Sequence, residues 1–168
     1  MDRQRVAVAF LTVSTAGILA WNAQESFTDR AIVPTKGDRP TIGFGSTRYE
    51  DGTPVRMGDT ITRERAAILA QNLRTTDEKR FAATVPGVHL YQAEFDIYMD
   101  FVGQFGIGAW RSSSMRRDLL AGNFTGACQA LLRYRFSAGY DCSRPGNKVC
   151  RGVWSRQQER HRRCMEAQ

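Results

Sequence analysis

The sequence predicts a mainly helical α+β domain with one small β-sheet near its N-terminus. Two observations carry this prediction. Apolar residues recur at helical spacing in several segments, and a short Gly-rich segment at residues 41–49 has the pattern of a strand that leads into a turn. The length of 168 residues and the hydrophobic share of 42% fit one globular domain with a proper core.

The strand and the helices are placed by local signals. Thr41–Tyr49 is the expected strand, and a turn at residues 50–53 leads to a possible return strand. Thr62 is a suitable N-cap for a helix over Arg63–Leu73, and Glu64 in its first turn faces the positive end of the helix dipole. Further helices are expected over residues 92–105, 124–136 and 153–165, and glycines at 103, 106 and 108 indicate close packing or a break.

An uncharged and mostly apolar run at residues 6–21 looks like an export signal. Arg3 and Arg5 precede it and favour a cytoplasmic N-terminus. Its 16 residues fall short of the roughly 20 that span a bilayer, and its Thr, Ser and Gly residues weaken its preference for lipid. A cleaved signal peptide, a permanent anchor and a buried first helix all remain open. The weak hydrophobicity favours a fourth interpretation, in which residues 1–24 form a marginal signal-anchor that leaves the membrane and packs as a helix. Residues 25–168 then form a single domain.

The four cysteines all lie in the C-terminal part of the chain. Their spacing lacks the paired CxxC pattern of a structural zinc site. In an oxidising compartment, two disulfides are expected, although the sequence does not fix their connectivity. Cys142 and Cys150 flank a loop that would close as a small ring, and Cys128 and Cys164 would then tie two helices together. Four reduced cysteines in a cytoplasmic protein are the alternative.

The net charge of +7 is concentrated in the C-terminal part. Residues 1–110 carry 12 Lys and Arg against 13 Asp and Glu, whereas residues 111–168 carry 12 against 4. Such a basic half implies a polyanionic partner, which could be nucleic acid, anionic lipid or an acidic cell-wall polymer. A solvated basic face with no partner is the other explanation.

Glu25 is the candidate for acid catalysis. It stands between the apolar run and the turn-rich segment that leads to Thr41. Desolvation raises the pKa of a carboxyl group toward neutrality, which suits a general acid. The alternative is a solvated carboxylate at a helix end. Together with the export-like segment, Glu25 indicates an exported hydrolase that uses acid catalysis.

Five blocks of the sequence occur in an order known from one protein family. Glu25 and Thr41-Ile-Gly-Phe-Gly45 come first, and the later blocks are residues 101–114, 119–124 and 152–159. The set covers nearly the whole chain and resembles phage-type lysozymes of glycoside hydrolase family 24. The last block carries Gln157 where the family often has a second Arg. The run at residues 6–21 is similar to that of signal-anchor-release endolysins, a subset of this family.

The resemblance implies a lysozyme-like fold with a small N-terminal β-sheet and a helical C-terminal lobe. It implies an endolysin that hydrolyses the β-1,4 bond between N-acetylmuramic acid and N-acetylglucosamine in peptidoglycan and so lyses the host cell. The implied mechanism is inverting, with Glu25 as general acid. Asp38 would stabilise charge and orient water, and Thr41 would hold that water.

The resemblance also implies where the protein acts. We expect an exported monomer, held at the periplasmic side of the host inner membrane through residues 6–21 and then released into the periplasm. Peptidoglycan is the expected partner. No metal, cofactor or nucleic acid is expected.

The loop before Thr41 departs from the family pattern. The family usually places Asp or Cys nine residues after the catalytic Glu and Thr six residues after that. Here the ninth residue is Pro34, and Thr41 comes one residue later than usual. Asp38 is the obvious carboxylate of this rebuilt loop, although a role as turn former before Arg39 and Pro40 explains it nearly as well. Thr35 and Asp29 remain rival candidates.

Two other classes of function stay open at this point. A non-enzymatic cationic protein that binds membranes or nucleic acid would use the basic segment Arg151–Arg163. A lytic transglycosylase would also use one Glu but would release anhydro sugar ends. His89 and His161 are too isolated in the sequence to indicate a metal site or a catalytic triad.

Overall fold

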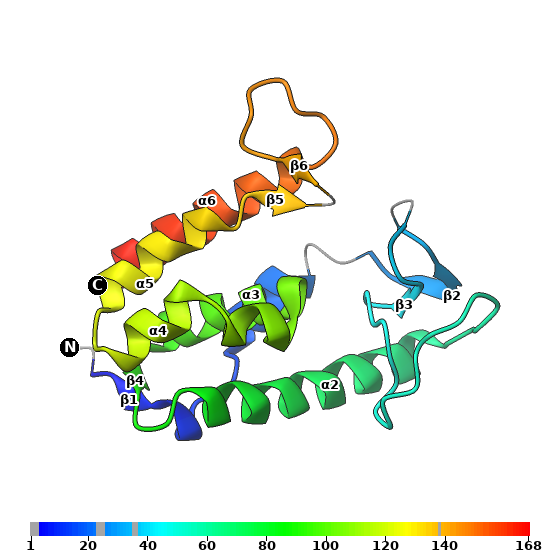
Figure 1. The fold of residues 1–168 in the computed structure, drawn as a ribbon. Coiled ribbons are helices and arrows are strands. Elements are labelled where there is room, and N and C mark those ends of the chain that lie inside the picture. The colour runs from blue at the N-terminus through cyan, green and yellow to red at the C-terminus, as the bar shows by residue number, and fades with distance from the viewer. Residues whose placement is uncertain (1–3, 23–25, 35–36, 138) are drawn as a thin grey trace. The chain divides into compact units, whose positions relative to one another are not determined.

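The expected fold class is confirmed by a computed structural model of the chain, which describes residues 4–22, 26–34, 37–137 and 139–168 (Figure 1). The described part is mainly helical, with small antiparallel sheets of two strands each. Contacts divide the chain into two compact units. We call residues 13–80 the N-terminal unit, and residues 1–12 with 81–168 the C-terminal unit.

The N-terminal unit contains two helices and one small sheet. Helix α1 spans Thr15–Asn22, and strands β2 (Thr28–Ile32) and β3 (Thr41–Gly43) pair antiparallel. Helix α2 covers Arg63–Thr84, and its last turn belongs to the other unit. The expected N-cap is confirmed, because the amide of Arg65 donates to the Thr62 hydroxyl at 3.2 Å.

The C-terminal unit is built from helices with short connecting strands. Its longest helix, α3, begins at Gln92 and ends at Arg111. Helices α5 and α6 are in contact and run side by side in Figure 1. The remaining elements are β1 (Val6–Ala7), the 3-10 helix η1 (Val8–Phe10), β4 (His89–Leu90), α4 (Ser114–Leu120), α5 (Phe124–Ala130), the 3-10 helix η2 (Leu131–Arg133), β5 (Phe136–Ser137), β6 (Tyr140–Asp141) and α6 (Arg151–Glu166).

Aromatic side chains form the core of the C-terminal unit. Trp110 is fully buried, and its ring centroid lies 4.7 Å from that of Phe81 and 5.3 Å from that of Tyr98. Its indole N–H donates to the Thr84 hydroxyl at 2.8 Å, so the one polar atom of the ring is satisfied. Phe101 is buried in the same core.

Helix α3 is broken at Gly106. This residue has φ 84° and ψ 159°, which a side chain would strain, and it interrupts the helix between Phe105 and Ile107. The break that the three glycines indicated is therefore confirmed at this position. It lets the chain change direction while Trp110 still enters the core.

The apolar N-terminal run does not form one helix. Its α-helical part is Thr15–Asn22, whereas Val6 and Ala7 pair with Leu90 and His89 and Val8–Phe10 form the short 3-10 helix η1. Val8 is 2% exposed, and its amide donates to the carbonyl of Val88 at 3.0 Å. The helix expected over residues 6–21 is therefore wrong for its first half, because strand pairing and burial of Val8 satisfy that stretch. Among the described residues, no helix has the length and hydropathy that a bilayer span requires.

Other expected elements differ in their ends. The helix expected over 124–136 stops at Ala130 and gives way to η2, after which Phe136 begins a hairpin strand. The expected helix over 153–165 is confirmed as α6. The strand expected over Thr41–Tyr49 ends at Gly43, and its return strand is reduced to a bridge between Arg48 and Pro54.

Candidate active site

The candidate site is framed by strand β2, which is paired along both edges. On one edge, Thr28 pairs with Gly43 and Ile32 with Thr41, with an irregular register between them. On the other edge, the amide of Ala31 donates to the carbonyl of Asp59 at 3.0 Å. The amide of Ile61 donates to the carbonyl of Asp29 at 2.9 Å. A strand bonded on both sides is a firm base for the loop that follows it.

Of the three predicted catalytic residues, the structure places two. Thr41 opens strand β3 and is half-buried, directly after the loop that joins β2 to β3. Asp38 lies in that loop, and its side chain is exposed. Glu25 lies outside the described residues, as does the rival candidate Thr35. The loop therefore brings an exposed carboxylate and a hydroxyl residue to the start of one strand.

Asp29, the other rival, is on a strand and not on a continued helix. Helix α1 ends at Asn22, and Asp29 is exposed in the middle of β2. Asp29 comes four residues after Glu25 and would share a face with it if the helix continued to Asp29, but the structure shows that it does not. Its backbone carbonyl is used in the pairing with Ile61.

The Gly-rich block turns tightly behind Thr41. Ile42 and Ser46 exchange backbone hydrogen bonds of 2.9 and 3.0 Å, which closes the turn. Gly43 has φ 64°, and a Cβ there would lie 2.7 Å from the Cβ of Ala66, so only glycine fits. Ile42 is fully buried in a small apolar cluster with Ala31 and Val55. Burial and close approach together hold the strand that carries Thr41.

Two aromatic rings and a guanidinium join the chain just after Glu25 to this turn. The ring centroids of Phe27 and Phe44 are 5.5 Å apart. The guanidinium of Arg63 lies 4.5 Å from the Phe27 centroid and 6.0 Å from that of Phe44. Such cation–π contacts stabilise by about 0.5–1 kcal/mol at exposed sites. Sequence reasoning missed this arrangement, since nothing in the spacing of residues 27, 44 and 63 indicates contact.

Charged pairs attach the loop after the turn to helix α2. Glu50 receives two hydrogen bonds from Arg65, at 2.9 and 2.7 Å, and one from Asn72 at 3.0 Å. The hydrogen bonds from Arg65 and then Asn72 lower the pKa of Glu50 to about 2. Glu50 thus stays ionised as a structural group, and it is no candidate for proton transfer.

In the C-terminal unit, one buried ion cluster joins α3 to α6. Arg160 is 3% exposed and donates to the carboxylate of Asp100 at 2.6 Å and to Gln104 at 2.7 Å. Arg156 also bonds to Asp100, and Gln157 donates to the carbonyl of Leu131 at 2.9 Å. Burial raises the pKa of Asp100, but the hydrogen bond from Arg156 and the charge of Arg160 outweigh it and hold the pKa below its usual value.

This cluster also decides how the charges of the last helix pair. The spacing of Arg156 and Glu159 in the sequence favours a pair between these two residues on one helix. Instead, Arg156 pairs with Asp100, and Glu159 pairs with Arg162 at 2.7 Å. The aliphatic and aromatic pattern of α3 gave no signal that Asp100 would face α6, because its partners Arg156 and Arg160 lie far away in the sequence.

Both disulfides that the sequence made possible are present. Cys128 is bonded to Cys164, which joins α5 to α6, and Cys142 is bonded to Cys150, which closes the small ring. Within the described ranges, no group of three or more His, Cys, Asp or Glu residues is arranged to hold a metal ion.

Comparison with known proteins places the chain in a family. The family model for phage lysozyme matches residues 22–160. The endolysin of Salmonella phage P22 is 29% identical over 132 residues, covering 78% of this chain and 88% of that protein. The endolysin of Bacillus phage B103 is 32% identical over 156 residues, covering 89% of this chain, which spans about half (53%) of that relative's length.

A solved structure gives the same result for the fold. The endolysin from Escherichia coli O157:H7 phage FAHEc1 has a TM-score of 0.69 and 27% identity, with 95% of this chain and 96% of that chain covered. The region that the family model matches includes the β2–β3 hairpin, the disulfide between Cys142 and Cys150 and the first turns of α6. On these grounds, this chain belongs to the phage lysozyme family.

Proposed function

We propose that the chain hydrolyses the β-1,4 bond between N-acetylmuramic acid and N-acetylglucosamine in peptidoglycan, with Glu25 as general acid. The single observation that carries this proposal is the family match over residues 22–160, which includes Glu25 and the Thr41 strand. The contact between Phe27 and Phe44 supports it, because it ties the chain just after Glu25 to the Gly-rich turn.

The proposed reaction is an inverting hydrolysis. Glu25 gives its proton to the bridging oxygen as the bond from that oxygen to the muramic acid C1 breaks. A water molecule attacks C1 from the opposite face, and Asp38 accepts a proton from that water. Thr41 holds the water through its hydroxyl. Inverting enzymes keep the two carboxyl groups roughly 6.5–9.5 Å apart to leave room for it.

Digestion of purified peptidoglycan by the wild type and by Glu25→Gln tests the proposal. Glutamine keeps the size of the side chain but cannot donate a carboxyl proton. We expect the folded variant to release almost no reducing ends. New reducing sugar termini in the wild-type digest would identify a hydrolase, whereas anhydro termini would identify a lytic transglycosylase. A folded Glu25→Gln protein with near wild-type rate would contradict the assignment.

The structure weakens the alternative of a non-enzymatic cationic protein. Arg156 and Arg160 in its basic segment are paired with Asp100, and Arg162 is paired with Glu159 and Glu166. These three cations are engaged by carboxylates of the C-terminal unit, which leaves Arg151 and Arg163 as the arginines of the segment that could offer charge to a membrane or to nucleic acid.

We further propose that the protein is an exported monomer that acts on peptidoglycan in the periplasm. In this proposal, residues 6–21 first hold the chain at the inner membrane and later leave it. The marginal length of this run and its Thr, Ser and Gly content support a weak hold by lipid.

A further inference from the structure

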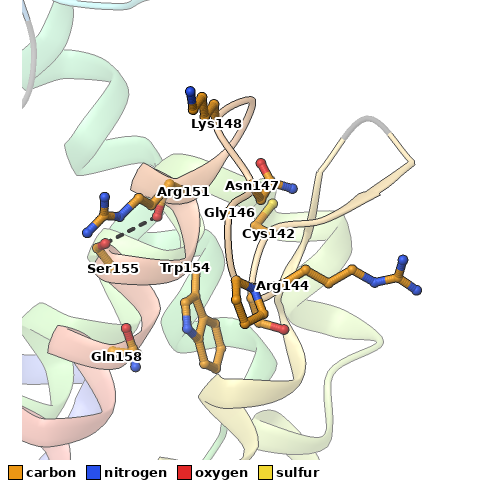
Figure 2. Close-up of a pocket in the computed structure, with 11 residues that line it drawn as sticks. Cys142, Arg144, Gly146, Asn147, Lys148, Arg151, Trp154, Ser155 and Gln158 are labelled. Atoms are coloured by element: carbon orange, nitrogen blue, oxygen red, sulfur yellow. Dashed lines mark hydrogen bonds between the residues drawn. The ribbon is translucent and has the colours of Figure 1, made fainter.

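A hollow of about 730 Å³ lies beside the disulfide-closed loop of the C-terminal unit. The loop, residues 142–150, forms one wall, and the first turns of α6 form the other. Figure 2 shows the indole of Trp154 between these two walls, with Lys148 at the top of the loop, Arg151 on the first turn of the helix with its guanidinium on the side away from the loop, and Gln158 lower on the helix. The catalytic candidates Asp38 and Thr41 belong to the other unit and take no part in it.

The loop is preorganised. The disulfide between Cys142 and Cys150 closes it, and the side-chain oxygen of Asn147 accepts the amides of Val149 and Cys150 at 2.8 and 3.0 Å. The Asp141 carboxylate accepts a hydrogen bond from the hydroxyl of Ser143 at 2.6 Å. A loop that is already ordered loses little conformational entropy when a ligand binds.

The cations of this hollow differ from those further along α6. Lys148 and Arg151 are exposed, and neither forms an ion pair with any carboxylate in the described part of the chain. The nearest acid in the chain, Asp141, is engaged by Ser143 and by Arg135 at 3.6 Å, and the charge of Arg144 also acts on it. Lys148 and Arg151 therefore remain uncompensated beside the hollow, which is also lined by Arg144, whose charge acts on Asp141.

The other lining groups suit a sugar or a peptide. Trp154 is half-buried and offers one face of its indole to the hollow, and such faces pack against sugar rings and amides. Gln158 adds an exposed amide group. Ser155 already donates its hydroxyl to the carbonyl of Arg151 at 3.2 Å, so it remains only as an acceptor.

We propose that this hollow is a non-catalytic binding site for the carboxylate groups of peptidoglycan. A carboxylate would receive charge-assisted hydrogen bonds from Lys148 and Arg151, while the adjoining sugar or peptide packs on Trp154. This inference rests on the proposed function, because it takes the same polymer as ligand. A membrane surface fits the geometry less well, since the lining is a hollow with polar groups and Val149 is the one large exposed apolar side chain of the loop.

The probe is the monomeric disaccharide-peptide of peptidoglycan, which has no muramic acid to glucosamine bond left to cleave. Binding is followed by the NMR signal of the Trp154 indole N–H, assigned with Trp154→Phe. We expect the double variant Lys148→Gln/Arg151→Gln to bind about tenfold more weakly than the wild type, which corresponds to the loss of one good charge-assisted contact. Lys79→Gln/Arg133→Gln removes the same charge from exposed positions elsewhere and should bind like the wild type.

Three further results decide the proposal. Equal binding by the two double variants would overturn it, as would a Trp154 signal that responds only to vesicles of phosphatidylethanolamine and phosphatidylglycerol. The lactyl carboxyl of the disaccharide-peptide is bonded to the peptide as an amide, so the free carboxylates of this probe are those of the stem peptide, whereas the same disaccharide without its peptide presents the lactyl carboxylate instead. Loss of binding without the peptide assigns the stem peptide, and binding of both probes shows that the hollow accepts either carboxylate. Because this probe is not cleaved, the result does not depend on whether Glu25 is the acid, so failure of the proposed function is seen separately in the digestion assay.

Discussion

Asp38 occupies the least conventional position among the proposed catalytic residues. It lies in the loop between β2 and β3, where Pro34 takes the place at which the family usually has an acid or a cysteine. The loop is anchored at both ends by strand pairing, so its carboxylate is carried by a firm support although it is exposed itself.

Asp38→Asn should lower the turnover on peptidoglycan by about 10²–10⁴-fold, because the amide cannot accept a proton from water. Its stability should change little, since Asp38 is exposed. Asp29→Asn, a matched change on β2, should retain activity. Initial rates of reducing-end release measure both variants. An active Asp38→Asn protein would transfer the role to Thr35, Thr41 or Asp29.

Asp100 is the residue whose loss should cost the most stability among the charged groups. Asp100→Asn would leave the buried Arg160 without its counter-charge, at a cost of about 3 kcal/mol in the free energy of unfolding. Denaturant unfolding measures this effect. Glu159→Gln, which breaks only the exposed pair with Arg162, is the control and should cost less than about 1 kcal/mol.

The same variant carries a pH signature. The pKa of Asp100 in the folded protein lies below its ordinary value, so its stabilisation is complete above about pH 4 and is lost as the pH falls through the folded pKa. Acid unfolding of the wild type should therefore show a loss of stability below about pH 4 that is smaller in Asp100→Asn. Parallel curves for the two proteins would contradict this role.

Among the elements, helices α5 and α6 depend on a covalent link as well as on packing. The bond between Cys128 and Cys164 closes a separation of 36 residues, whereas the bond between Cys142 and Cys150 closes one of 8. Chain-entropy arguments assign about 4 kcal/mol to the longer loop and about 2.5 kcal/mol to the shorter one.

We therefore expect Cys128→Ser/Cys164→Ser to lower the free energy of unfolding more than Cys142→Ser/Cys150→Ser does. Thermal and denaturant unfolding of the two double variants give the comparison. Loss of the bond between Cys142 and Cys150 should mainly disturb the shape of the hollow beside Trp154 and should leave the core intact. Mass spectrometry of alkylated, non-reduced protein checks the bonds themselves, and four alkylated thiols would contradict both.

At the scale of the whole molecule, residues 4–12 pack into the C-terminal unit in the folded protein. In the structure, Arg5 donates to the Glu94 carboxylate at 3.1 and 3.2 Å, and Glu94 is fully buried. Strand β1 pairs with β4 in the same unit. A chain whose residues 6–21 remained in a bilayer would lack both contacts and would leave Glu94 buried without its cation.

Replacing Thr12 and Gly17 with Leu should make the proposed anchor permanent and delay lysis. Leu raises the hydrophobicity of residues 6–21 at two positions where Thr and Gly lower it, so the segment would stay in the bilayer. Thr12→Ser/Gly17→Ala is the conservative control and should lyse on time. Fractionation with N-terminal sequencing measures the outcome. Soluble protein that retains Met1 or Asp2 would support release, whereas a soluble form that begins after Ala16 would show a cleaved signal peptide.

The sequence by itself determined the fold class, the family and the helix signals. The Thr62 cap, the break at Gly106 and helix α6 were all predictable, because capping and backbone freedom act within one turn of the chain. The possibility of two disulfides was also visible in the sequence. Glu25, Asp38 and Thr41 were named from blocks and spacing, and their catalytic roles stay predictions.

Tertiary structure decided what depends on distant partners. Strand pairing with His89 and Leu90 turned part of the expected N-terminal helix into β1, and the cluster around Asp100 gave Arg156 a partner other than Glu159. The hollow beside Trp154 exists because a disulfide ring folds against the start of α6. Such contacts join residues far apart in sequence, and their energies come from burial and charge neutralisation that no local pattern records.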